Sequence, residues 1–127
     1  MEPDIQLEGS VIKRFVAKNK QERYLNLILD NSKRKKFIDD LAHFRHLKFS
    51  EFDKMSDQIE SLVKQRVGSI KYCYVISENK NIDARLLEID FALSQTIGYR
   101  MGTLLIFGDA KFVYYEGEEP GDRWLSK

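Results

Sequence analysis

Residues 103–107 and 110–115 are two apolar stretches separated by the dipeptide Gly-Asp at positions 108–109. Because glycine suits the first central position of a type II′ turn, this pattern predicts a β-hairpin with a two-residue loop. The turn sets the register, which pairs Leu105 with Phe112 and gives the hairpin two largely apolar faces. A hairpin with one face in water alternates apolar and polar side chains instead. We therefore expect helices on both sides of the sheet, or a partner on one of them.

The chain has 127 residues, of which 43% are hydrophobic, so it has enough apolar material for one core and is short for two domains. A few short helices cover one face of a hairpin more easily than both. Leaving a Leu or Phe side chain in water forgoes roughly 1.5–3 kcal/mol of burial energy. We therefore expect a homodimer with two-fold symmetry, joined through a sheet face or a strand edge. The alternative is that residues 11–17 or the second predicted helix crosses to the uncovered face.

Helix-like spacing of apolar side chains marks two segments near the N-terminus. The first covers about residues 20–30, and the second starts near Ser32. Residues 11–17 fit either a short strand or an extended arm. Residues 1–10 are expected to be a flexible N-terminal tail, so that residues 11–127 form a single folded domain.

A third helix is expected over residues 50–67, with Ser50 as its N-cap and Gly68 at its end. Because residues 53–56 are weakly helical, a shorter helix that begins at Ser56 is the alternative. The apolar stripe of the longer helix should pack against the sheet and consists of Phe52, Met55, Ile59 and Leu62.

The second half of the chain is richer in Tyr, Ile, Val and Phe, which favour strands. Residues 70–77 have the composition of a strand, and residues 87–97 fit a helix ended by Gly98 better than they fit a strand. The expected fold is α+β, with about three N-terminal helices followed by a small, mostly antiparallel sheet of three to four strands and one further helix. The order of elements is α-α-α-β-α-β-β.

Charge is nearly balanced, with 21 Lys and Arg against 20 Asp and Glu, but basic residues concentrate in residues 13–36. Lysine and arginine neutralise phosphates along a nucleic-acid backbone, so this segment is a candidate for binding nucleic acid or another polyanion. No sequence motif of a known nucleic-acid module accompanies it, and a solvated helix surface is the simpler interpretation. The candidate residues are Lys13, Arg14, Arg23, Lys33, Arg34, Lys35 and Lys36.

Two residues in the second half are candidates for a ligand site, or for catalysis by a small enzyme of unrecognised type. Asp90 falls inside the apolar arc of the expected 87–97 helix, where a half-buried carboxylate would suit general acid–base chemistry. Arg100 lies in the tight connector after Gly98, from which it could reach a ligand or a carboxylate. The simpler interpretation of Asp90 is a hydrogen-bonded structural residue.

Asp39, His43 and His46 share one face if their segment is helical, and imidazole and carboxylate groups at this spacing can hold a transition metal. That face points away from the apolar stripe of the helix, so a solvated polar surface is the simpler interpretation. The acidic loop at 116–122 lacks the ligand spacing of an EF-hand. Cys73 lies in the middle of a strand, which favours a buried, inert thiol. We therefore expect no metal and no cofactor.

Familiar catalytic motifs are absent from the sequence, which has no Gly-rich phosphate loop, no GxSxG and no HExxH. A single cysteine and the lack of an apolar run of about 18–20 residues favour a cytoplasmic protein that does not cross a membrane. The function that fits best is a non-enzymatic module that binds another protein. Nucleic-acid or polyanion binding is the first alternative, and a small enzyme is the second.

Overall fold

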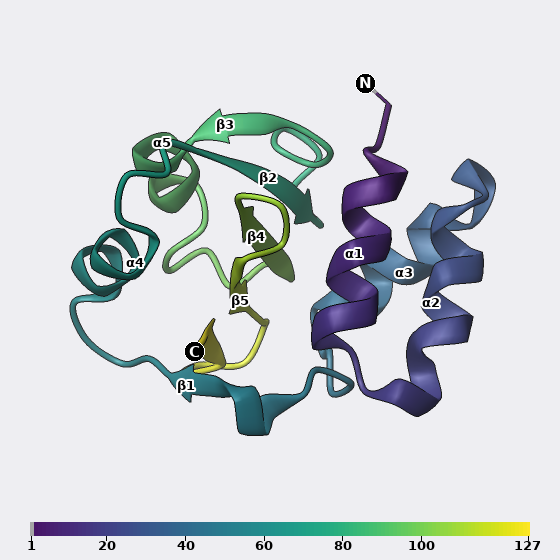
Figure 1. The fold of residues 1–127 in the computed structure, drawn as a ribbon, viewed down its shortest axis with the longest axis horizontal. Helices are drawn as coiled ribbons and strands as arrows, with labels where there is room; N and C mark the ends of the chain where they lie inside the picture. Colours follow the sequence, from purple (N-terminus) through teal and green to yellow (C-terminus); the bar gives the residue numbers. More distant parts are fainter. Residues whose placement is uncertain (1) are drawn as a thin grey trace.

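A six-stranded antiparallel sheet lies between two helical layers in the computed structural model, which describes residues 2–127 (Figure 1). The predicted α+β class is confirmed. The helices are α1 (Ile5–Phe15), α2 (Gln21–Ile28), α3 (Arg34–Leu41), α4 (Ile59–Val67) and α5 (Ile89–Ser94), with short 3-10 helices η1 (Lys18–Lys20), η2 (Asn31–Lys33) and η3 (Phe49–Glu51). The strands are β1 (Phe52–Lys54), β2 (Tyr72–Ser77), β3 (Leu86–Glu88), β4 (Thr103–Phe107), β5 (Phe112–Glu116) and β6 (Arg123–Ser126).

The strands lie in the order β1-β6-β5-β4-β2-β3. The sheet therefore has six strands, and the expectation of three to four is wrong. Two of the additional strands, β1 and β3, have three residues each and lie at the two edges of the sheet. Segments this short carry too little alternation to be recognised in a sequence, because their strand conformation depends on the neighbouring strand.

The central hairpin of β4 and β5 has a wider loop than the sequence predicts. Leu105 pairs with Tyr114 and Phe107 pairs with Phe112, so the loop contains four residues rather than two. Within it, Ala110 is buried and accepts a hydrogen bond from Arg14 at 2.9 Å, a contact with α1 that the turn sequence cannot reveal. The observed register differs from the predicted one by two residues. Each side chain therefore remains on its predicted face, since only an odd shift exchanges the faces.

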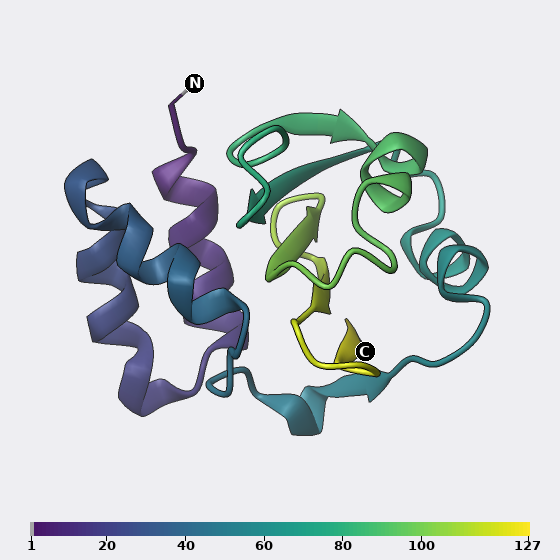
Figure 2. The ribbon, with the colours of Figure 1, turned by 180° about the vertical axis from the view of Figure 1, so that it is seen from behind.

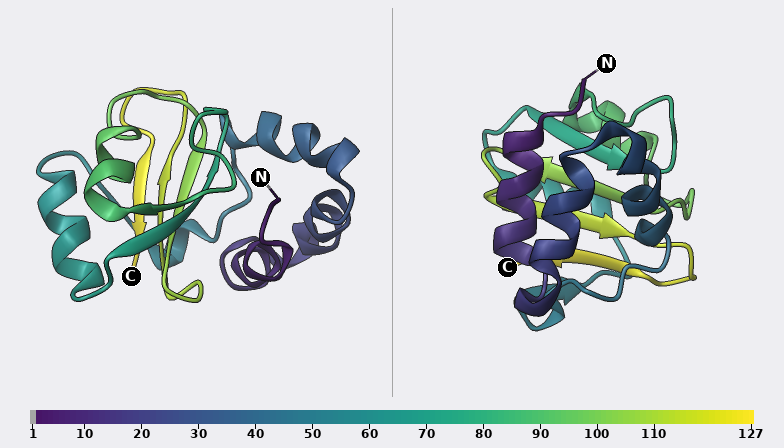
Figure 3. Two further views of the ribbon diagram at one scale, coloured as in Figure 1. Left: turned by 90° about the horizontal axis from the view of Figure 1, so that it is seen from above. Right: turned by 90° about the vertical axis from the view of Figure 1, so that its right-hand side faces the viewer.

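Both apolar faces of the sheet are covered within the chain. Figure 2 shows α1, α2 and α3 as one layer beside the sheet, with α4 and α5 on its other side, and the edge-on view of Figure 3 shows the same three layers. The two faces belong to two separate clusters of buried residues, one containing Leu104 and Tyr115 and the other containing Leu105 and Tyr114. The expectation of a homodimer joined through a sheet face assumed that one apolar face is uncovered. Both faces are buried within one chain, so this reason for a homodimer no longer holds.

The N-terminal segment is a helix rather than a flexible tail followed by a strand or arm. Helix α1 begins at Ile5 and ends at Phe15, and the side chain of Asp4 caps it by accepting from the Leu7 N–H at 3.0 Å. Within residues 5–10, both Glu8 and Gly9 are buried. The buried Val11, Ile12 and Phe15 have the spacing of an amphipathic helix, so the sequence does carry a signal for this segment.

The predicted helix over residues 50–67 is a strand followed by a shorter helix. Strand β1 pairs with β6, and α4 begins at Ile59, close to the alternative start at Ser56. The predicted apolar stripe is also wrong, because Phe52 belongs to the cluster on the opposite face from Ile59, and Leu62 is 41% exposed. Pairing with the β6 edge overrides helix propensity in this segment.

Residues 87–97 contain both of the structures that the sequence left open. Strand β3 ends at Glu88, and α5 occupies Ile89–Ser94. The alternating pattern reflects the strand at the beginning of the segment, and the 3.6-residue pattern reflects the helix that follows it.

Candidate functional site

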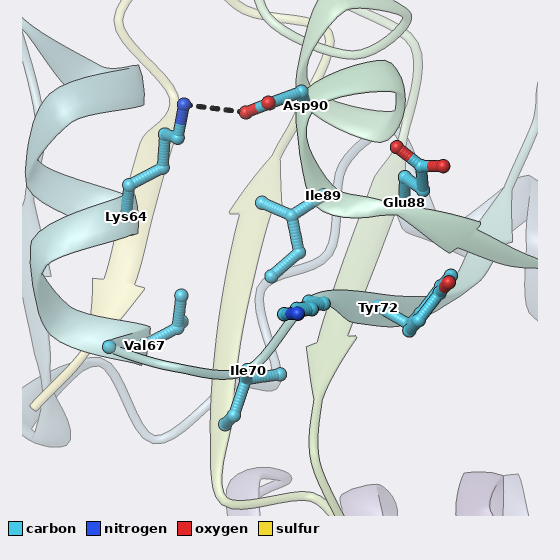
Figure 4. Close-up of a pocket in the computed structure, with 9 residues that line it drawn as sticks. Lys64, Val67, Ile70, Tyr72, Glu88, Ile89 and Asp90 are labelled. Atoms are coloured by element: carbon cyan, nitrogen blue, oxygen red, sulfur yellow. Dashed lines mark ion pairs between the residues drawn. The ribbon is translucent and has the colours of Figure 1, made fainter.

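Asp90 lies in the first turn of α5, and 67% of its side chain is exposed. It is therefore not half-buried as expected, because α5 begins at Ile89 and directs Asp90 toward solvent. Asp90 Oδ1 lies 2.6 Å from Nζ of Lys64 on α4, as Figure 4 shows. The hydrogen bond to Asp90 and the attraction of its charge raise the pKa of Lys64. Asp90 thus links α4 to α5 at the surface.

The Lys64–Asp90 pair lies at the rim of a pocket of about 360 Å³ between α4, the start of β2 and the end of β3 (Figure 4). Ligand pockets commonly combine an apolar lining with a few polar groups that orient the ligand. The aliphatic residues that line this pocket suit an apolar side chain of a ligand. The charged residues that line it are exposed to solvent, so they can contact the polar groups on either side of that side chain. The lining residues are Lys64, Val67, Gly68, Ile70, Lys71, Tyr72, Glu88, Ile89 and Asp90.

Arg100 is exposed, and its backbone has a left-handed conformation with φ of 54°. Its N–H donates to Oε2 of Glu116 at 2.9 Å, and the Gly98 N–H donates to the same oxygen at 3.1 Å. Glu116 is fully buried and also accepts from the Tyr114 hydroxyl at 3.0 Å. These contacts fix the connector, while no hydrogen bond or ion pair within residues 2–127 joins Arg100 to Asp90.

Exposed apolar side chains occur on β3, on the neighbouring strand β2 and on α5, which follows β3. Tyr72 is 53% exposed, Leu86 is 68% exposed and Phe91 is 51% exposed. Tyr72 and Leu86 point to the same face of the sheet, because Tyr72 pairs with Glu88 and Leu86 pairs with Tyr74. We call these three residues together with the backbone of β3 the β3 surface. Large exposed apolar side chains beside an edge strand make this region a candidate interaction site.

The outer edge of β3 also presents unpaired backbone groups. The Ile89 N–H donates to the Lys71 carbonyl, and the Val75 N–H donates to the Arg85 carbonyl, each at 3.0 Å. Since backbone groups alternate in direction along an antiparallel strand, Leu87 faces β2, while Leu86 and Glu88 face away from it. The Glu88 carbonyl is engaged by α5, because Glu88 is the N-cap of that helix. The groups that no strand within residues 2–127 pairs are the N–H and C=O of Leu86 and the N–H of Glu88.

Arg34, one of the predicted polyanion contacts, is turned into the fold. Its side chain is 12% exposed, and its guanidinium lies 2.7 Å from Glu8 and 2.9 Å from Asp83. Burial lowers the pKa of Arg34, but hydrogen bonds to Asp83 and Glu8 outweigh this effect and raise it. Glu8 is fully buried and also accepts from the Tyr74 hydroxyl at 2.7 Å. Arg34 therefore joins α3 to α1 and to the loop after β2, and it is not available to bind a phosphate.

The other basic candidates divide into bonded and free side chains. Arg14 donates to a backbone carbonyl, while Arg23 and Lys35 form ion pairs with acidic residues of α3 at 3.4 and 3.1 Å. The chain thus neutralises part of its own basic segment. The exposed candidates whose side chains make neither an ion pair nor a hydrogen bond within residues 2–127 are Lys13, Lys33 and Lys36.

The candidate metal ligands are not assembled into a site. Helix α3 ends at Leu41, so the helical spacing that would have aligned Asp39, His43 and His46 is lost. His43 pairs with Glu118 at 3.0 Å, and Asp39 pairs with a lysine. Among residues 2–127, no group of three His, Cys, Asp or Glu side chains is placed to hold a metal ion.

The remaining candidate features are structural. Cys73 is buried in β2, and burial raises the pKa of its thiol to about 12, so the reactive thiolate is scarce at neutral pH. In the acidic loop at 116–122, Glu116 is buried and Asp122 accepts from the Trp124 indole N–H at 2.9 Å. These carboxylates hold the loop in place.

None of the helices within residues 2–127 is long and apolar enough to cross a membrane. Comparison of the chain with family models, curated proteins and solved structures finds no match. What the protein does must therefore be inferred from its own surfaces and contacts.

Proposed function

We propose that this protein is a non-enzymatic interaction module that binds another protein through the β3 surface. The observation that carries the proposal is the exposure of Leu86 on an edge strand with outward backbone groups, together with exposed Tyr72 on β2 and exposed Phe91 on α5. Burying one such side chain contributes roughly 1.5–3 kcal/mol. An extended segment of a partner can add hydrogen bonds along a free edge, as in binding by strand addition.

The neighbouring pocket supports the same proposal. It opens beside Tyr72 and Glu88, at the end of the β2–β3 pair, where a segment added to β3 would continue. Its aliphatic lining suits an apolar side chain of that segment, and Lys71 and Glu88 are exposed at its rim. Polar groups at the rim of an apolar contact set orientation more than affinity.

The alternative functions have less support. A small enzyme would need titratable groups held in a closed site, whereas Lys64 and Asp90 are exposed and paired with each other. Binding of nucleic acid or another polyanion would depend on Lys13, Lys33 and Lys36, because Arg34 is bonded inside the fold. A location in the cytoplasm stays a prediction.

Selection of random linear peptides displayed on phage tests the proposal. We expect enriched peptides to bind the wild-type protein and to lose about tenfold to hundredfold in affinity in the Leu86→Asp variant, matching the burial energy of one apolar side chain. Leu29→Asp is the matched control, since Leu29 is 67% exposed at the end of α2. Equal binding by the Leu86→Asp variant, or no enrichment above background, would refute the proposal.

A further inference from the structure

We infer that one partner of the β3 surface is a second copy of this chain, with the two β3 strands paired antiparallel about a two-fold axis. The inference rests on the proposed function, because it uses the same edge strand. In Figure 1, β3 is the uppermost strand, and no helix or strand is drawn above it. A second copy could therefore extend the sheet through this edge, although both sheet faces are covered.

The direction of the backbone groups limits how two β3 strands can pair. Leu86 and Glu88 face outward and Leu87 faces inward, so an outward residue must lie opposite an outward residue of the second copy. Three symmetric registers satisfy this condition, and they place Leu86, Leu87 or Glu88 on the two-fold axis. The register centred on Glu88 sets two carboxylates opposite each other, which is unfavourable.

The register centred on Leu87 uses the free groups best. Each Glu88 N–H then donates to the Leu86 carbonyl of the second copy, so the axis generates two such bonds. The Leu86 N–H faces the Glu88 carbonyl of the second copy, which has a second lone pair beside its bond to α5. The register centred on Leu86 sets Glu88 opposite Ala84 of the second copy, which is a poorer partner, because Ala84 is not extended (φ of 59°) and its N–H is already bonded to Val75 at 2.8 Å.

Charge along the strand does not oppose the antiparallel arrangement. In the register centred on Leu87, Glu88 lies opposite Leu86 of the second copy, so no like charges are set directly opposite each other. The outward donors and acceptors of β3 therefore match those of a second β3 without a charge conflict. This match of backbone groups favours a second copy as the occupant of the edge.

Apolar contacts accompany the pairing on both sides of the extended sheet. The two Leu87 side chains lie directly opposite each other on the side of α5, and the two Leu86 side chains are diagonal neighbours on the other side. Leu86 is 68% exposed in the single chain, so it gains the most from being covered. A two-fold contact of this kind closes after two copies and does not propagate into a filament.

Cysteine cross-linking tests the register. In the register centred on Leu87, the two Leu87 residues form a non-hydrogen-bonded pair, whose Cα atoms lie about 4.5 Å apart, within disulfide reach. Cys73 lies across from Leu87 in the β2–β3 ladder and must be replaced first, so all variants carry Cys73→Ala. Under mild oxidation, we expect Leu87→Cys to form a covalent dimer and Leu86→Cys to do so about tenfold more slowly or not at all, since diagonal positions exceed that reach. Faster cross-linking of Leu86→Cys would overturn the register.

Sedimentation over a concentration series tests the association itself. We expect a monomer–dimer equilibrium for the wild-type protein and for Leu29→Lys, and a monomer for Leu86→Lys. A wild-type protein that stays monomeric and does not cross-link would overturn the inference. Peptide binding lost in Leu86→Asp would then still support the proposed function, whereas the absence of both results would reject both. A dimer that persists in Leu86→Lys would also overturn the inference, because its interface would lie elsewhere.

Discussion

Replacement of Arg34 by methionine should destabilise the protein severely. The change keeps much of the side-chain volume but leaves the fully buried Glu8 without its cation, which lies 2.7 Å away in the native fold. Removing one partner of a buried ion pair costs about 3–5 kcal/mol, because the remaining charge is left uncompensated. At this chain length that loss lowers Tm by roughly 10–20 °C. Since domains of this kind are stable by only about 5–15 kcal/mol, the variant should be close to unfolding at moderate temperature.

Urea denaturation followed by circular dichroism measures this effect, with two controls. Arg23→Met removes an exposed ion pair of 3.4 Å and should cost less than about 1 kcal/mol. Adding Glu8→Gln to Arg34→Met should recover part of the loss, because it removes the buried charge. A cost for Arg34→Met as small as that for Arg23→Met would refute the reasoning. The same result would return Arg34 to the set of residues free to bind a polyanion.

Two further predictions concern close packing and pH. Gly102→Ala should destabilise the fold by about 3 kcal/mol in the same denaturation assay, since the new Cβ would lie 2.4 Å from the Ala42 backbone nitrogen. Gly9→Ala in α1 meets only a leucine methyl at 3.7 Å and should be neutral or stabilising by up to about 1 kcal/mol. Hydrogen bonds from the Ser32 side chain and backbone lower the pKa of Asp30, so its stabilising contribution is present above the unfolded pKa and is lost as pH falls through the folded one. NMR titration should show the Asp30 pKa rise in Ser32→Ala, and an unchanged value would contradict this cause.

Much of the fold follows from patterns that act over short distances. The hairpin of β4 and β5 is marked by its two apolar stretches, and α2 is marked by the spacing of Tyr24 and Ile28, both of which are buried. The two-faced hairpin also correctly indicates that the sheet needs cover on both sides. These features depend on local periodicity and on the apolar character of individual side chains, which a sequence displays directly.

The edge strands and the buried ion network depend on contacts between distant segments. Nothing near Phe52 indicates that it pairs with Ser126, so its segment resembles a helix in isolation. Glu8 did leave a signal, because it lies three and four residues before Val11 and Ile12 on the apolar side of α1. A charged residue on an apolar stripe implies a buried partner, but the sequence does not say that Arg34 is that partner.

The sequence indicates only part of the proposed site. The sequence indicates Asp90 as a candidate ligand-site residue, and Asp90 lines a pocket in the structure. Its expected half-buried position assumed that the helix begins at residue 87, whereas residues 86–88 form β3 and α5 begins at Ile89. The β3 surface was missed, because Leu86 and Tyr72 look like core residues in a sequence. In the structure Leu86 lies on the edge strand β3 and Tyr72 is the first residue of β2 beside it, and both side chains are exposed.

Amide hydrogen exchange at β3 tests most directly whether this edge is the interaction surface. In the monomer at low concentration, we expect fast exchange at Leu86 and Glu88, whose N–H groups face outward, and slow exchange at Leu87, which faces β2. Binding of a selected peptide or of a second copy should slow exchange at Leu86 and Glu88 and leave Leu87 unchanged. Protection that instead arises in α1 to α3, with Leu86 and Glu88 still exchanging fast in the complex, would contradict the assignment of β3 as the binding edge.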